Sequence, residues 1–325
     1  MKKMIFLLLI LFARSSVQAQ TAGENFSLNG NRNLMDLTSG DISEIRNFGN
    51  YLDDSVNNSG NASPYALIAG GSKGIGFAIA EALAKRKYNL ILVARHMDTL
   101  IAAKNKLESV YHVQVDVLSF DLSKEETAGE IAKWCTGKNI PLKMLCNVAG
   151  LGGAEDYLSL SLDSLRYMVR LNIESAMALS LTLLPLLEKN APSYILNVAS
   201  MAGLAPIPWK NIYSATKAAL VSFSYALRYQ LRDKKVSVSC LAPGPVYTHL
   251  SIEIETKKQL GRFGDLMAVK PKRVGEVAVR KTLKGRPLIV PGTIARIMSG
   301  VIRFFPKRWV TYIYGKAGDR NRKKR

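Results

Sequence analysis

Two kinds of hydrophobic pattern alternate along residues 64–292. Short apolar runs, typical of buried strands, are separated by longer segments in which apolar residues recur every three or four positions, as on one face of a helix. The runs lie at 66–70, 89–94, 113–120, 142–148, 193–199, 236–241 and 287–290. The helical segments lie at 75–87, 97–110, 124–136, 158–189 and 212–232. This alternation predicts an α/β fold, a doubly wound parallel sheet of about seven strands with helices on both faces.

A glycine-rich turn joins the first predicted strand to the first helix. It reads Gly70-Gly71-Ser72-Lys73-Gly74-Ile75-Gly76. Glycines permit a tight turn and close approach to a pyrophosphate, which the free N–H groups and positive dipole of a helix N-terminus can bind. The turn therefore predicts a dinucleotide site. The alternative is an ordinary glycine turn before a helix.

The charge after the second predicted strand bears on the choice of dinucleotide. An acidic residue there would hold the ribose 2′-hydroxyl of NAD, whereas a basic residue suits the 2′-phosphate of NADP. This strand ends in Arg95, no acid precedes Asp98, and Lys73 supplies a second cation from the glycine turn. The sequence thus favours NADP(H) over NAD(H). The alternative is a pair of solvated surface cations.

A tyrosine and a lysine lie four positions apart in the last predicted helix. On a helix, this spacing places Tyr213 and Lys217 on one face. A neighbouring ammonium stabilises a phenolate, so we expect Lys217 to lower the tyrosine pKa toward neutrality. Ser200 ends the apolar run 194–200 and could bring a hydroxyl to the same place. Taken alone, the pair could be ordinary neighbours on a surface helix.

These motifs together resemble the short-chain dehydrogenase/reductase family. The family's T-G-x-x-x-G-x-G motif reads Ala69 to Gly76 here, and its N-N-A-G motif reads Asn147-Val148-Ala149-Gly150. Its active-site asparagine, serine, tyrosine and lysine match Asn172, Ser200, Tyr213 and Lys217, and its P-G motif begins at Pro243-Gly244. The resemblance covers residues 64–292 in register. Ala69 and Val148 depart from the family pattern without removing a catalytic group.

The resemblance implies a Rossmann-like catalytic domain that transfers hydride between a nicotinamide and a carbonyl carbon. Tyr213 would give the proton, Ser200 would bind the carbonyl oxygen, Lys217 would tune the tyrosine and touch the ribose, and Asn172 would hold a relay water. The alternative for Asn172 is a helix-kink residue. The implied cofactor residues are Gly70, Ser72, Lys73, Gly74, Ile75, Gly76, Arg95, Asp121, Asn147, Ala149, Gly150, Tyr213, Lys217, Pro243, Gly244, Val246 and Thr248.

Substrate and partners are less sharply indicated. The apolar segment 201–209 should line the pocket mouth, and 249–267 should form a mobile lid, which suits a hydrophobic carbonyl or alcohol. The family resemblance also implies a homo-oligomer. No metal site is expected, because His96, His112 and His249 are scattered. A non-catalytic cofactor-binding protein at a membrane surface is the alternative function.

The C-terminal segment 293–325 is a basic amphipathic tail. The 325-residue chain carries a formal net charge of +20. From Lys270 to the end, 17 Lys or Arg stand against Glu276 and Asp319, which gives +15. Apolar residues also repeat at helical spacing from Ile294 to Phe305. The tail indicates either an anionic membrane surface or a helix packed on the domain. Nucleic acid is not expected, because no base-stacking module accompanies the charge.

The N-terminal segment has features of its own. Residues 1–19 combine a basic start, a short apolar run and a V-x-A pattern, which predict a signal peptide or an anchor. Residues 20–63 are rich in Asn, Ser and Gly and predict a flexible linker. Three cysteines do not suggest a disulfide framework. A signal peptide suggests export or membrane association, whereas the cofactor chemistry suggests a cytosolic active site, so the location stays open.

Overall fold

The computed structural model describes residues 63–152, 160–208, 210–247 and 268–322. The predicted signal peptide or anchor, the linker up to residue 62, Trp209, Thr248 and the predicted lid at 249–267 lie outside the described residues.

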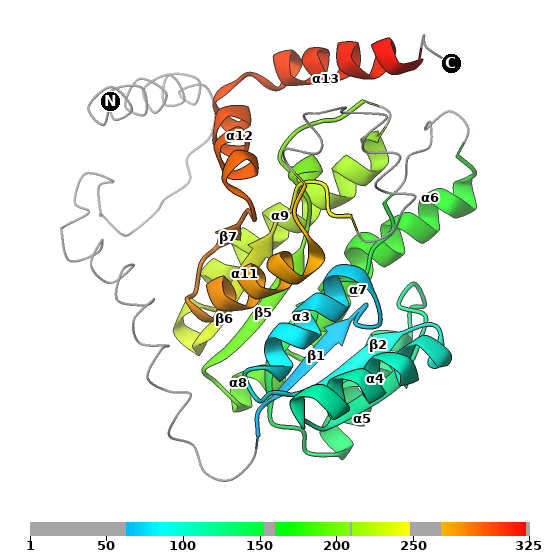
Figure 1. The fold of residues 1–325 in the computed structure, drawn as a ribbon, viewed down its shortest axis with the longest axis vertical. Coiled ribbons are helices and arrows are strands. Elements are labelled where there is room, and N and C mark those ends of the chain that lie inside the picture. The colour runs from blue at the N-terminus through cyan, green and yellow to red at the C-terminus, as the bar shows by residue number, and fades with distance from the viewer. Residues whose placement is uncertain (1–62, 153–159, 209, 248–267, 323–325) are drawn as a thin grey trace, which may run out of the picture. The chain divides into compact units, whose positions relative to one another are not determined.

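A parallel sheet of seven strands organises the described residues, in the order β3-β2-β1-β4-β5-β6-β7 (Figure 1). The strands are β1 (Tyr65–Ala69), β2 (Asn89–Ala94), β3 (Val115–Ser119), β4 (Leu142–Asn147), β5 (Ser193–Val198), β6 (Val236–Leu241) and β7 (Leu288–Ile289). All seven predicted strands are confirmed: the bounds of β2 and β6 match the prediction, and the ends of the others differ by at most two residues. The strand order reverses between β1 and β4, so the loops that follow these two strands lie where ligands bind in open α/β sheets.

Helices cover both faces of the sheet and bury two separate apolar clusters (Figure 1). On one face lie α3 (Gly74–Ala84), α4 (Met97–Tyr111) and α11 (Pro271–Leu283); on the other lie α5 (Thr127–Gly137), α7 (Ser175–Thr182) and α9 (Asn211–Gln230). Successive strand residues alternate between the clusters, so Leu67 joins one and Ile68 the other. Coverage on both faces explains why β1, β5 and β6 are buried along their whole length and read as continuous apolar runs.

The predicted helix over 158–189 is wrong as a single element. The structure divides it into α6 (Leu162–Val169), a π-helical turn (Arg170–Glu174), α7, and α8 (Leu184–Lys189). Pro185 lies in the first turn of α8, where its missing N–H is tolerated, and it could not continue α7.

Helix α11 was absent from the sequence prediction. Most of its residues are charged or polar, so the short apolar stripe formed by Val274, Ala278 and Val279 is not conspicuous in the sequence. In the structure this stripe is buried against the sheet. A β-carbon at Gly275 would lie 2.2 Å from the carbonyl oxygen of Ala78, so α11 crosses α3 in backbone contact. An ion pair between Arg86 and Glu276 closes the same interface.

Two helices follow β7: α12 (Thr293–Phe304) and α13 (Lys307–Arg322). The helical spacing predicted from Ile294 to Phe305 is confirmed by α12, whereas α13 was expected only as a basic segment. Among the described helices, none is both long enough and apolar enough to cross a membrane. Within the same residues, no cluster of His, Cys, Asp or Glu could hold a metal ion.

Candidate active site

Ser200 and Tyr213 meet at the carboxyl end of β5. Ser200 precedes a short 3-10 turn (Met201–Gly203), and its Oγ accepts a hydrogen bond of 3.1 Å from the backbone nitrogen of Ala202. Tyr213 lies in the first turn of α9 and is hydrogen-bonded to Ser200. A strand end and a helix start thus bring together two hydroxyls that are thirteen positions apart in the chain.

Gly203 holds the turn after Ser200 against α9. A β-carbon at Gly203 would lie 2.6 Å from both the carbonyl carbon and the oxygen of Lys217, so only glycine allows this approach. Gly203 is not predicted from the sequence as a site residue, because a single glycine in a loop does not reveal which backbone segment contacts it. By holding the turn against α9, Gly203 positions the Ser200 hydroxyl.

Lys217 is a buried amine at the centre of the site. Its side chain is only 4% exposed, and Nζ donates a hydrogen bond of 2.9 Å to the carbonyl oxygen of Val198. Burial lowers the pKa of Lys217 from 10.5 to about 8, against a smaller opposing influence from Cys240. Below about pH 8 the lysine therefore holds a positive charge next to Tyr213.

The expectation that Lys217 lowers the tyrosine pKa is not met in this structure. Burial raises the pKa of Tyr213 above 10.0, and the hydrogen bond with Ser200 only partly offsets that rise. The amine points to the Val198 carbonyl and lies 5.9 Å from the centre of the Tyr213 ring. The phenol thus keeps its proton at neutral pH, the state that a proton donor requires.

Asn172 occupies the π-helical turn between α6 and α7. It is only 1% exposed; Nδ2 donates to the carbonyl of Leu151 at 3.0 Å and to Oγ1 of Thr216 at 3.1 Å. Its Oδ1 accepts from the backbone nitrogen of Leu151 at 2.7 Å. The amide thus ties the π-helical turn to Leu151 and to Thr216 on α9. The relay water remains a prediction.

Gly150 joins Asn172 to Lys217. A β-carbon at Gly150 would lie 3.0 Å from Nζ of Lys217 and 3.1 Å from Oδ1 of Asn172. The segment after β4 therefore passes between these two side chains. Asn172, Lys217 and Tyr213 converge on one place, although they come from separate elements.

The glycine turn after β1 lies against the segment that follows β4. Gly70 has a φ of +90°, and a β-carbon there would lie 2.8 Å from the backbone nitrogen of Ala149. A β-carbon at Gly76 would lie 1.9 Å from the oxygen of Gly70. Lys73 stands at the N-cap of α3 and makes no side-chain capping bond, which leaves the helix N-terminus open to an anion. Ser72 and Ile75 are half-buried in the same turn.

Arg95 follows β2 and is exposed, as is Lys73. Nη1 of Arg95 donates a hydrogen bond of 2.7 Å to the hydroxyl of Tyr167 on α6, and the guanidinium lies 6.0 Å from the centre of that ring. The sequence did not predict Tyr167, because α6 approaches β2 only in the folded chain. The tyrosine restrains the cation that we expect to meet the 2′-phosphate.

Asp121 follows β3 and accepts hydrogen bonds from Ser123, 3.0 Å from the backbone nitrogen and 2.8 Å from Oγ. Burial raises the pKa of Asp121, but the bonds from Ser123 and the charges of Arg95 and Lys124 outweigh it, so the pKa is lowered. Asp121 is thus a carboxylate whose nearest partners belong to its own turn. Its contact with the adenine side of the cofactor remains a prediction.

Asn147 ends β4, and its side chain is hydrogen-bonded inside the sheet. Its Nδ2 donates to Oδ1 of Asn197 at 2.8 Å and to Oγ of Ser180 at 3.1 Å, and Nδ2 of Asn197 donates to Ser224 at 2.9 Å. All four side chains are buried and link β4, β5, α7 and α9. These hydrogen bonds hold the centre of the sheet together, and the contact of Asn147 with the cofactor remains a prediction.

The segment after β6 lies beside the Ser200 turn. The carbonyl of Pro243 accepts a hydrogen bond of 3.0 Å from the backbone nitrogen of Met201. Gly244 is half-buried, and Val246 packs in the apolar cluster on the α3 face. Pro243 and Gly244 therefore adjoin the site, whereas the Val246 side chain belongs to the core.

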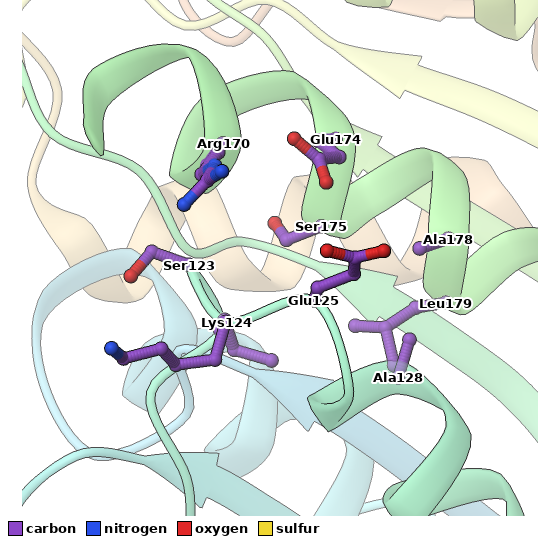
Figure 2. A pocket seen from close by; sticks show the side chains of 10 residues that line it. Ser123, Lys124, Glu125, Ala128, Arg170, Glu174, Ser175, Ala178 and Leu179 are labelled. Atoms are coloured by element: carbon purple, nitrogen blue, oxygen red, sulfur yellow. The ribbon is translucent and has the colours of Figure 1, made fainter. Parts of the chain in front are cut away.

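A small groove lies elsewhere, between the loop after β3 and the π-helical turn (Figure 2). Arg170 and Glu174 line it from one side, and Lys124 and Glu125 from the other. None of the four predicted catalytic residues lines this groove, so it is separate from the site around Tyr213.

Known proteins resemble this chain in sequence and in fold. The chain is 30% identical over 191 residues to the very-long-chain 3-oxoacyl-CoA reductase-A of Danio rerio, an alignment that covers 58% of this chain and 59% of that protein. It is 33% identical over 188 residues to the NADP-dependent 3-hydroxy acid dehydrogenase of Schizosaccharomyces pombe. This alignment covers 57% of this chain and 73% of that protein. The alignment thus spans less than two thirds of the Danio rerio protein.

A solved structure extends the comparison. L-sorbose reductase from Gluconobacter frateurii, complexed with NADPH and L-sorbose, matches with a TM-score of 0.64 at 25% identity over 71% of this chain and 95% of that one. The family model for short chain dehydrogenases matches residues 64–259, which is more than half of the chain. With its seven-stranded parallel sheet and its glycine turn at the switch point, the chain belongs to the short-chain dehydrogenase family.

Proposed function

We propose that this protein is an NADP(H)-dependent oxidoreductase that reduces the carbonyl of a hydrophobic substrate to an alcohol, or catalyses the reverse. The observation that carries the proposal is the convergence of Ser200, Tyr213 and Lys217 at the end of β5, beside the glycine turn. A proton donor, a second hydroxyl and a buried cation are the groups that carbonyl reduction needs from the protein.

The bound nicotinamide would supply or accept the hydride. In reduction, Tyr213 gives its phenolic proton to the oxygen of the carbonyl as hydride reaches the carbon, so that the product is a neutral alcohol. Ser200 holds that oxygen through its Oγ. Lys217 is cationic below about pH 8 and stabilises the tyrosinate left behind until the proton is replaced. Asn172 stands next to Lys217 and is the candidate to hold a water on the return path.

Two cations support NADP(H) as the cofactor. Lys73 stands at the N-cap position of α3 in the glycine turn, and Arg95 follows the neighbouring strand β2. A guanidinium offers a planar fork to phosphate oxygens, and the hydrogen bond from Arg95 to Tyr167 holds that fork near one position. The Schizosaccharomyces pombe relative is NADP-dependent by name, and the sorbose reductase was solved with NADPH.

A 3-oxoacyl or 3-hydroxyacyl compound is the substrate class that we favour. The segment after Ser200 carries the half-buried apolar side chains of Leu204 and Ile207, which suit an aliphatic chain better than a sugar. The names of the Danio rerio and Schizosaccharomyces pombe relatives refer to 3-oxoacyl-CoA and 3-hydroxy acids. We also infer a homo-oligomer from the family, which light scattering tests. Protease protection in cells distinguishes export from a cytosolic catalytic domain.

The experiment is a chain-length series. We expect the protein to oxidise NADPH in the presence of 3-oxoacyl-CoA compounds, with kcat/KM that rises with chain length and exceeds that for L-sorbose. Ser200→Ala should lower kcat/KM by about 100-fold or more, as loss of a transition-state hydrogen bond does. The matched control is Ser164→Ala, at an exposed serine on α6. NADPH binding without oxidation by any carbonyl would instead favour the non-catalytic cofactor-binding alternative.

A further inference from the structure

Exposed apolar side chains gather on α12 and α13. Of the 16 large apolar residues that are exposed in the described chain, seven lie between residues 297 and 313. They are Ile297, Val301, Phe304, Phe305, Trp309, Tyr312 and Ile313. We call this set the C-terminal apolar face. Isolated exposed apolar residues are ordinary on a protein surface, but seven of them between residues 297 and 313 indicate an interaction site.

Helix α12 is apolar on two opposite sides. Ala295, Ser299 and Ile302, spaced by four and three positions, pack inward in the cluster formed with β7 and the segment after Ser200. Ile297, Val301 and Phe304 have the same spacing but start two residues later, which turns them about 200° around the helix. They are exposed, Ile297 by 61% and Phe304 by 76%. Packing on the domain therefore leaves the outer stripe uncovered.

Helix α13 continues the arrangement. Val310 is buried and Tyr314 is half-buried on its inner side, whereas Trp309, Tyr312 and Ile313 are exposed. The amine of Lys316 lies 4.9 Å from the centre of the Tyr312 ring. Tryptophan and tyrosine beside lysine are the residues that favour the boundary between lipid headgroups and acyl chains.

The charge around the C-terminal apolar face has one sign. Residues 293–316 contain Arg296, Arg303, Lys307, Arg308 and Lys316 and no acidic residue. Arg280 and Lys281 near the end of α11 and Arg286 just after it add to this charge. Burial, together with the charges of Arg296, Arg280 and Arg286, lowers the pKa of Lys281. Two copies of this surface would bring like charges together, so an anionic partner fits better than a second copy.

We propose that the C-terminal apolar face docks on an anionic membrane surface, with its apolar side chains at the level of the upper acyl chains and its basic side chains among the headgroups. Nucleic acid matches the charge but not the exposed Ile, Val and Phe side chains. An interfacial helix pair satisfies both the apolar and the basic residues. The inner side of α12 is packed on the domain, which was one of the two alternatives left by the sequence, and the proposal concerns its outer side.

Docking there would bring the substrate entrance close to the bilayer. A β-carbon at Gly315 would lie 3.7 Å from Cγ of Pro208, and Met201, next to Ser200, shares a cluster with Ile302 and Val310. The segment expected at the pocket mouth is thus in contact with α13. This consequence rests on the proposed function, whereas the docking itself does not.

Binding of the full-length protein to vesicles tests the docking. Because residues 1–12 contain an apolar run of their own, every variant keeps the whole chain and changes only α12 and α13. We expect Ile297→Ser/Val301→Ser/Phe304→Ser to bind vesicles of phosphatidylcholine with 30% phosphatidylserine about tenfold or more weakly than the unchanged protein. The control, Met97→Ser/Ile101→Ser, changes exposed apolar residues on α4 and should bind normally.

A charge-matched pair tests the electrostatic part. Arg303→Gln/Lys307→Gln/Arg308→Gln should weaken binding to the same vesicles about tenfold or more at low salt, and less at high salt. Lys85→Gln/Lys133→Gln/Lys189→Gln removes the same charge from exposed positions elsewhere and should have little effect.

Quenching by brominated lipid locates the surface. The unchanged protein should show a quenched tryptophan component that is lost in Trp309→Phe. Equal binding by the apolar-face variant and the unchanged protein would overturn the proposal, as would an unquenched Trp309. Self-association that the apolar-face variant abolishes, without any dependence on vesicles, would overturn it in favour of a second copy. None of these readouts uses activity, so they stand apart from the proposed catalysis.

Discussion

Helix α9 buries polar side chains, whereas helices α12 and α13 expose apolar ones. On α9, Ser214, Thr216, Lys217 and Ser224 are all at most 4% exposed. On α12 and α13, the C-terminal apolar face stands in solvent. Both regions reverse the usual distribution of polar and apolar residues, and each reversal costs folding free energy. A buried polar cluster therefore indicates function inside a site, and an exposed apolar cluster indicates function at a surface.

The largest expected effect on the α9 side comes from Lys217→Met, which removes the buried amine. The folded pKa of about 8 lies below the unfolded value of 10.5, so the unfolded chain binds the extra proton between these pH values. The stability of the unchanged protein should therefore rise as pH increases from 8 to 10.5, by up to about 3 kcal/mol relative to the variant.

Urea unfolding of both proteins at pH 7, 9 and 10 measures the difference, with Lys133→Met as the exposed control. Parallel pH dependences for the unchanged protein and Lys217→Met would mean that the lysine is solvated rather than buried. The same variant should lose turnover by about 100-fold or more, because the tyrosinate loses its cation.

A smaller effect is expected at Gly203, which lets the Ser200 turn touch α9. Gly203→Ala should displace the turn and cost about 1–3 kcal/mol of stability, as overpacking does. Gly129→Ala on α5 is the matched control, since a β-carbon there meets nothing within 4 Å and should stabilise the helix. Thermal unfolding measures both variants: Gly203→Ala should lower the stability and Gly129→Ala should raise it. A neutral Gly203→Ala with full turnover would show that this contact does not position Ser200.

The smallest effects concern cofactor preference. Arg95→Asp should lower the affinity for NADPH by about tenfold or more relative to the affinity for NADH, because a carboxylate repels the 2′-phosphate. Tyr167→Phe keeps the ring but removes the hydroxyl that holds Arg95. It should therefore lower the affinity for NADPH only severalfold, as loss of one hydrogen bond does. Fluorescence titration with both cofactors measures this. An unchanged preference in both variants would make Arg95 an ordinary surface cation.

The sequence predicted the elements whose patterns are local and left open what depends on the fold. The strands, the glycine turn and the pair Tyr213 and Lys217 follow from runs and spacings. The hydrogen bonds of Asn172 to Leu151 and Thr216, and the one between Arg95 and Tyr167, join segments that are distant in the chain, so no local pattern encodes them.

Burial explains two side-chain environments that local patterns do not reveal. A buried amide must find hydrogen-bond partners, and Asn197 and Ser180 lie beside the amide of Asn147. The spacing of Tyr213 and Lys217 predicts a lowered tyrosine pKa, but burial raises that pKa and only the hydrogen bond with Ser200 opposes the rise. In α12, Ile297 and Ile302 read alike in sequence, and only the packing decides which one is exposed.

The most direct measurement of the central claim is single-turnover oxidation of NADPH by Tyr213→Phe, with the affinity for NADPH measured in parallel. The variant keeps the ring and removes the transferable proton, so NADPH should bind with nearly unchanged affinity while hydride transfer to a 3-oxoacyl-CoA falls by about 100-fold to 10,000-fold. Tyr229→Phe, at an exposed position of the same helix, should behave like the unchanged protein. Hydride transfer by Tyr213→Phe at a near-normal rate would contradict the assignment of Tyr213 as the proton donor.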